Sequence, residues 1–146
     1  MELKYLEAPN VKLAINGDLD LKFFAPEISF TEEVLIENAT LNGIDLFGTW
    51  FVGGVIFRNC IFNCYFNWTY GGHNTKPVIF ENCVFKEFAN FEDCTFESRF
   101  VLRNVEFIEG TNLLGNLESP LRVLFEIFPL LENITGNLHV DSTRNE

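Results

Sequence analysis

The chain has 146 residues, of which 47% are hydrophobic and 17 are phenylalanine, and its formal net charge is −11 at pH 7. This composition excludes a disordered chain, because it supplies ample apolar surface for a core, and the shortage of Lys and Arg argues against direct nucleic-acid binding. No window approaches the roughly 18 apolar residues of a membrane helix, and the N-terminus lacks the apolar region of a signal peptide, so no membrane partner is expected.

A five-residue unit recurs along most of the chain. Each unit has a large apolar centre and, except for Phe100, a small or β-branched residue two positions before it; ten of the thirteen residues two positions after a centre are Gly, Asn, Asp or Ser, which favour turns. Between residues 13 and 35 only Leu13-Ala-Ile15-Asn-Gly17 and Ile28-Ser-Phe30 keep this pattern. This segment is therefore predicted to be an irregular first coil.

From residue 36 to residue 118 the repeat predicts regular coils. A period of five fits neither a helix at 3.6 nor a strand at 2, so the chain should turn a corner every five residues and close a coil with four sides. Centres 21, 23 and 22 residues apart should then stack on one face, about 4.8 Å per coil. The predicted centres are Ile36, Leu41, Leu46, Phe51, Phe57, Phe62, Phe80, Phe85, Phe91, Phe96, Leu102, Phe107 and Leu113.

Two units, Ile44-Asp-Leu-Phe-Gly48 and Thr111-Asn-Leu-Leu-Gly115, show the motif most clearly. In them the chain resembles the pentapeptide-repeat family, whose loose motif is a small residue, a polar residue, Leu or Phe, and two variable residues. The match covers residues 34–115, and frequent six-residue steps depart from it. The resemblance implies a right-handed quadrilateral β-helix, with a less regular right-handed β-helix as the alternative.

Residues 119–146 are predicted to cap the open end of the solenoid. Ser119-Pro120 is typical of the start of a helix, Pro129 would end it, and residues 133–140 would return as a strand. The expected fold is all-β: a right-handed parallel β-solenoid of about four to five coils with a short C-terminal capping helix. Residues 1–146 would form a single domain.

The four cysteines are expected to be reduced thiols in a cytoplasmic protein. Cys60, Cys83 and Cys94 occupy the small inward position of their units, where a thiol acts as a small hydrophobe. Cys60 and Cys64 have no matching second pair, so a zinc site is not favoured. No cofactor and no metal are expected.

Three groups of residues are candidate binding surfaces. Glu87, Glu92, Asp93, Glu97 and Glu109 are expected on the corners of the third and fourth coils, forming an acidic side. Residues 63–77 form a deformed pair of sides, in which Trp68, Tyr70 and His73 are either a contact spot or core filling.

The first face should carry two outward rows. Glu37, Arg58, Glu81 and Arg103 alternate in sign, which predicts a ladder of attractive pairs. Leu35, Ile56, Ile79 and Val101 form an apolar stripe. The terminal segments would cover this stripe, or it would bind a partner or a second copy in a homodimer.

Catalysis has little support, since the chain has two histidines and no recognisable catalytic motif. We therefore expect a non-catalytic acidic protein that binds a protein partner with a basic surface. Acidic members of the family resemble duplex DNA and modulate DNA gyrase or other topoisomerases. That resemblance implies a nucleic-acid-mimicking inhibitor of a DNA-binding protein, of the topoisomerase or phage and plasmid anti-defence type. The alternatives are a generic interaction scaffold and, more remotely, a carbohydrate-active β-helix enzyme.

Overall fold

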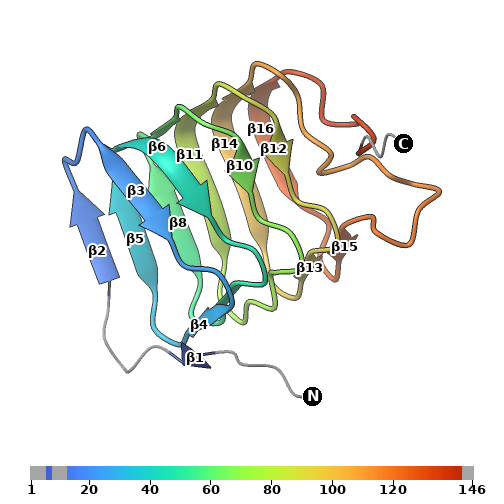
Figure 1. The fold of residues 1–146 in the computed structure, drawn as a ribbon. Helices are drawn as coiled ribbons and strands as arrows, with labels where there is room; N and C mark the ends of the chain where they lie inside the picture. The colour runs from blue at the N-terminus through green and yellow to red at the C-terminus, as the bar shows by residue number, and fades with distance from the viewer. Residues whose placement is uncertain (1–5, 8–12, 143–146) are drawn as a thin grey trace.

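A computed structural model describes residues 6–7 and 13–142 and shows an all-β parallel solenoid of about four turns. The strands stack side by side along one axis, with the N-terminal coils at one end and the C-terminal coil at the other (Figure 1). All strand pairs within the described residues are parallel. This arrangement explains the five-residue period, because each side of a coil is one short strand.

Four faces make up each coil. The first is a continuous ladder of β2 (Leu13–Asn16), β5 (Val34–Glu37), β8 (Val55–Arg58), β11 (Val78–Phe85), β14 (Phe100–Phe107) and β16 (Leu130–Thr135). The second face contains β3 (Leu21–Phe24), β6 (Thr40–Asp45), β9 (Ile61–Phe62) and the second halves of β11, β14 and β16. The third contains β10 (Phe66–Asn67) and β12 (Ala89–Asn90). The fourth contains β1 (Leu6–Glu7), β4 (Ile28–Phe30), β7 (Trp50–Phe51), β13 (Thr95–Phe96) and β15 (Leu124–Phe125).

The length of a coil is nearly constant until the last one. Equivalent asparagines on successive coils are 22, 21, 23 and 22 residues apart, and the final step is 29 residues. The extra residues form an excursion at the C-terminal end, visible as the orange loop in Figure 1. The predicted repeat of 21 to 23 residues is confirmed for the regular coils.

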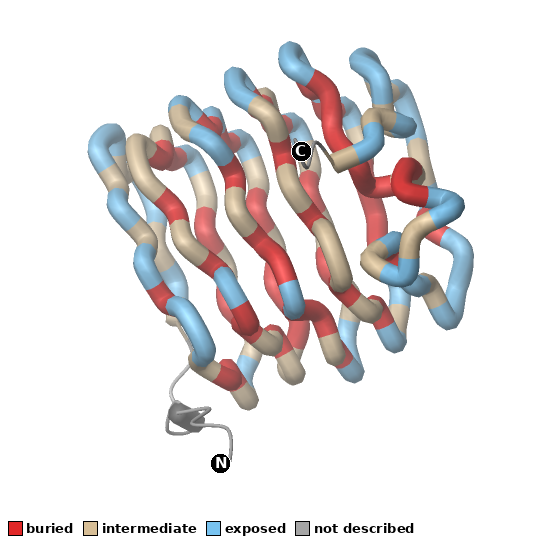
Figure 2. Tube along the Cα trace, turned by 45° about the vertical axis from the view of Figure 1, so that its right-hand side comes forward, coloured by how far each residue is buried: buried red, intermediate tan, exposed pale blue. Residues whose placement is uncertain are grey.

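Aromatic stacking fills the core. All 13 predicted centres are buried, and so is the small residue that precedes each of them. Phe85 stacks between Phe62 and Phe107, with ring centroids 4.4 and 4.7 Å apart. Figure 2 shows the result, in which buried segments alternate with exposed corners along every coil. Stacked rings add about 0.5–1.5 kcal/mol per pair beyond the burial of apolar area.

The predicted capping helix is wrong. Within residues 13–142 the structure has no helix, and Ser119 instead forms a turn in which its Oγ accepts the Leu121 N–H at 2.9 Å. The following segment pairs as β15 with β13, and Phe125 stacks on Phe96 with centroids 5.7 Å apart. The exposed edge of β13 offers backbone partners and an apolar shelf, and these outweigh the local helix signal.

The returning strand lies earlier than predicted. It is β16, which spans Leu130–Thr135, whereas the sequence suggested residues 133–140. Beyond it, Thr111 donates its N–H to the Asn137 carbonyl, and Leu114 donates to the Leu138 carbonyl. The chain thus adds one more layer to the third face before the described residues end.

Candidate partner-binding surfaces

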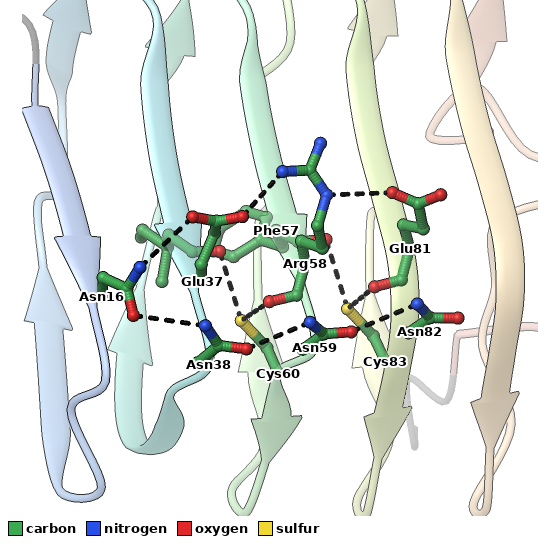
Figure 3. Close-up of polar contacts among 11 residues, drawn as sticks. Asn16, Glu37, Asn38, Phe57, Arg58, Asn59, Cys60, Glu81, Asn82 and Cys83 are labelled. Atoms are coloured by element: carbon green, nitrogen blue, oxygen red, sulfur yellow. Dashed lines mark hydrogen bonds and ion pairs between the residues drawn. The ribbon is translucent and has the colours of Figure 1, made fainter.

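The first face carries a ladder of alternating charges (Figure 3). Arg58 lies 2.7 Å from Glu37 and 3.0 Å from Glu81, so its guanidinium bridges the coils on both sides. Arg103 continues the series at 3.7 Å from Glu81 and 2.8 Å from Glu132. The predicted alternation is confirmed, and Glu132 extends it by one rung.

These ion pairs leave the first face nearly neutral. Hydrogen bonds from Arg58 to Glu37 and Glu81 raise the pKa of Arg58 above its ordinary value, and the bond to Glu132 does the same for Arg103. The side chains of Arg58 and Arg103 are 36% and 37% exposed, so water screens the pairs. Each Arg58 pair therefore stabilises the fold by only about 0.2–1 kcal/mol.

A ladder of asparagines runs beside the charges (Figure 3). From Asn38 onward, each Nδ2 donates to the Oδ1 of the asparagine one coil nearer the N-terminus, at 2.6–3.2 Å. Every member except the first has a φ of 54–56°, a left-handed conformation that asparagine tolerates better than most residues. The ladder consists of Asn16, Asn38, Asn59, Asn82, Asn104 and Asn133.

The apolar stripe is less open than the sequence suggests. Leu35, Ile56, Ile79 and Val101 pair in register across four strands, so each is flanked by the next. The first three are half-buried, and Val101 is buried. Leu130 on β16 continues the stripe and is the member exposed at the end, at 37%.

The predicted acidic residues lie on three corners rather than on one side. Glu87 lies between β11 and β12, as Glu109 does one coil further on; Glu92 and Asp93 lie between β12 and β13; and Glu97 lies between β13 and β14. Glu97 also contacts His73, since the Oε2 of Glu97 lies 3.0 Å from the Nδ1 of His73. The acidic groups therefore surround the solenoid.

Charge is also uneven along the axis. Residues 78–99 contain five carboxylates and two cations, whereas residues 55–77 contain two cations and no carboxylate. From residue 78 to residue 142 there are eleven carboxylates and four cations, a net charge of −7. A cationic coil thus separates two acidic blocks.

Trp68 belongs to the core, so of the two interpretations of this residue, core filling is confirmed and the contact spot is ruled out. Its side chain is fully buried, and its Nε1 donates to the Thr49 carbonyl at 3.0 Å. The indole makes edge contacts with Phe51 and Phe96, each with centroids 5.3 Å apart. It fills the space that His73 leaves, because His73 has a φ of 53° at the position equivalent to these phenylalanines.

Tyr70 and His73 do reach the surface. Tyr70 is 49% exposed and packs edge-on against Phe47, with centroids 5.3 Å apart. The half-buried His73 ring lies 4.4 Å from the Trp50 ring. These two pairs make a small aromatic surface beside the acidic corner of Asp93. One sequence signal could have identified Trp68 as a core residue. It lies two positions after Phe66, and the same two-residue spacing separates the two inward residues of every unit.

Cys60, Cys83 and Cys94 are buried at the inward positions predicted for them, Cys64 is half-buried, and all four cysteines are free. Burial raises the pKa of the Cys94 thiol far above its usual value, and its Sγ donates to the Trp68 carbonyl. A hydrogen bond with Cys83 lowers the pKa of Cys60, while burial raises that of Cys83. Among the described residues, no group of three or more His, Cys, Asp or Glu side chains could hold a metal ion.

A hollow at the C-terminal end of the solenoid was not predicted from the sequence. One part, of about 440 Å³, is lined by both apolar and polar side chains, which include Leu117, Asn116 and Asp141. A neighbouring part of about 320 Å³ has apolar walls that include Leu117 and Phe128. The sequence signal for it was the extra length of the last coil, but those extra residues were interpreted as a capping helix.

Comparisons with protein families, curated proteins and solved structures find no match to this chain. In the part of the chain that the structure describes, no helix is long and apolar enough to cross a membrane.

Proposed function

We propose that the protein is a non-catalytic cytoplasmic binding protein of the pentapeptide-repeat type, whose acidic C-terminal half occupies the nucleic-acid site of a DNA-binding protein. Charge density is the observation that supports this proposal. Residues 78–99 form one coil with a net charge of −3. At about 4.8 Å per coil, that is about one negative charge per 1.6 Å, close to the roughly 1.7 Å of duplex DNA.

The distribution of charge favours a compact target. The cationic coil at residues 55–77 interrupts the acidic surface, so a long DNA channel would meet an unfavourable segment. The block from residue 78 to residue 142 stays acidic over the last coils and suits a basic patch of limited length. Its carboxylates stand on a rigid scaffold, which reduces the entropy lost on binding.

The alternatives receive less support. A scaffold that binds through the apolar stripe would need more open apolar surface than Leu35, Ile56 and Ile79 provide. A carbohydrate-active enzyme would need two carboxylates facing each other across a groove. The five residues of the predicted acidic side are instead spread over three corners of the solenoid.

The proposal can be tested with purified DNA gyrase, the target of acidic members of the family that the chain resembles, in a DNA-competition assay. We expect the full chain to displace duplex DNA, with an affinity that falls steeply as salt rises. A variant with Glu87, Glu92, Asp93, Glu97 and Glu109 changed to the corresponding amides should lose most of this competition, chiefly through a slower on-rate.

A matched control removes the same number of charges from the other acidic block, by changing Asp18, Asp20, Glu27, Glu32 and Glu33 to amides. It should compete nearly as well as the unchanged chain. Competition that survives the first set of substitutions, or that the control reduces equally, would contradict the proposal. If gyrase is not displaced, the same pair of variants can be compared by affinity capture from bacterial lysate at rising salt. In that experiment, the proposal is supported if the control captures a partner in a salt-sensitive way and the variant with the C-terminal substitutions does not.

A further inference from the structure

The C-terminal end of the solenoid is an open sheet edge. Among the described residues, β16 pairs with β14 and with no other strand, so the backbone groups on its far side have no strand partner. β16 forms the last rung beside the C-terminus in Figure 1. Such an edge is a template for another extended chain.

Apolar side chains at this edge are poorly covered. Leu102 is fully buried between two coils, but Leu131, which stacks on it, is only half-buried. In the segment that leads from β15 into β16, Leu124, Ile127 and Phe128 are 47%, 45% and 76% exposed. One more strand on β16 would cover Leu131 as Leu131 covers Leu102. An exposed apolar group of this kind marks an interaction site.

The polar ladders specify what the next strand should carry. The charge ladder alternates and ends on Glu132, whose Oε1 binds Arg103, while no bond to its Oε2 occurs within the described residues. The asparagine ladder ends on Asn133, which donates to Asn104 but accepts no side-chain bond among the described residues. The next rung therefore calls for a cation beside Glu132 and an amide donor beside Asn133.

We infer that the β16 edge binds an extended segment of a partner protein, which adds in parallel and carries two apolar residues followed by Arg or Lys and then Asn. Two strands of the chain already have this order and lie against glutamate-bearing neighbours. They are Ile56-Phe57-Arg58-Asn59, of which the first three residues lie in β8 and Asn59 follows it directly, and Val101-Leu102-Arg103-Asn104 in β14. This inference does not depend on the acidic corners, because it concerns a different surface.

A second copy of the chain fits this edge less well. Two copies meeting end to end through β16 would bring together two halves with a net charge of −7 each. In a head-to-tail arrangement, the first strand of the ladder, β2, would place Asn16 rather than a cation beside Glu132. Neither arrangement supplies the missing positive charge, so the edge favours a foreign strand.

Fluorescence anisotropy with the full chain tests the inference. The probe is a labelled peptide with the sequence of Phe100–Phe107 between Gly-Ser flanks, and its control replaces the arginine with glutamate. We expect the arginine peptide to bind at least about tenfold more tightly than the glutamate peptide. In a Glu132→Arg variant this preference should reverse, since the complementary charge has moved to the protein.

Two further variants make the result decisive. Glu32→Arg adds the same charge on a coil far from β16 and should keep the original preference. Glu132→Gln should bring the two affinities close together, and it serves if thermal unfolding shows that Glu132→Arg does not fold. Absence of binding up to about millimolar peptide, equal binding of both peptides, or an unchanged preference in the Glu132 variants would overturn the inference. Self-association in sedimentation that Glu132→Gln abolishes would also overturn it, by making a second copy the occupant.

Discussion

The central coils and the last coil are built from the same unit but differ in how completely they bury it. In the centre, Phe57, Phe80 and Phe85 are fully buried because each has a neighbour above and below. In the last coil, Phe125 and Leu131 pack against the preceding coil and, among the described residues, no further coil covers their other side, so they remain half-buried. The stability of a coil therefore comes largely from its neighbours, as in other repeat proteins. A terminal coil leaves part of its apolar surface exposed, and this surface can bind a partner.

The sharpest test of this difference compares two truncations. Phe85→Ala should lower the free energy of unfolding by about 3–5 kcal/mol, because it opens a cavity between two stacked rings. Leu131→Ala removes a half-buried side chain and should cost clearly less, about 1–2 kcal/mol. Urea denaturation followed by circular dichroism measures both. Equal losses would mean that the last coil is packed as tightly as the centre.

Glycine positions give the next largest contrast. At Gly72, φ is 99° and an added Cβ would lie 2.1 Å from the Thr95 carbonyl oxygen of the next coil. Gly72→Ala should therefore cost at least about 2 kcal/mol. Gly17 has a φ of 76° but no atom within 4 Å of such a Cβ, so Gly17→Ala should cost about 1 kcal/mol, from backbone strain alone. The same denaturation assay decides, and a Gly72→Ala variant as stable as Gly17→Ala would contradict the close approach of the two coils.

Cys94→Ser probes the polarity of the central core. A hydroxyl is costly in an apolar stack, but the Trp68 carbonyl that accepts from Sγ could accept from Oγ as well. We expect a loss of about 1–2 kcal/mol. Because all four thiols are free, adding a reducing agent should not change the stability of the unaltered chain. Unfolding of that chain by the reductant would show that disulfides form.

The smallest effect is expected at the charge ladder. Arg58→Met keeps the apolar stem but removes the bridge between Glu37 and Glu81, and should cost about 1 kcal/mol or less. Arg103→Met, nearer the open end, should cost less still, since its contact with Glu81 is longer at 3.7 Å. Thermal unfolding at low and high salt measures both. A loss that does not shrink in salt would indicate that packing of the stem, rather than charge, stabilises this face.

The regular coils could be predicted well from the sequence because, within each unit, the residue types show which positions point into the core and which point to solvent. Each of the 13 centres is buried, and the charge ladder forms as the spacing required. The errors lie where local signals compete with long-range pairing. Ser119-Pro120 is a good helix start, yet the edge of β13 draws the following residues into β15. For Trp68 the sequence leaves both a contact role and a core role open, and its edge contacts with Phe51 and Phe96 place it in the core.

The asparagine ladder points in one direction, and this has a consequence for how the protein is made. From Asn38 onward, every amide of the ladder donates to the asparagine one coil nearer the N-terminus, so each new coil supplies the donor and the coil before it supplies the acceptor. A chain emerging from the ribosome could therefore add coils one at a time onto a finished template, without waiting for its C-terminus. Pulling on the C-terminus should peel the coils off in the reverse order, with the poorly covered last coil yielding at the lowest force.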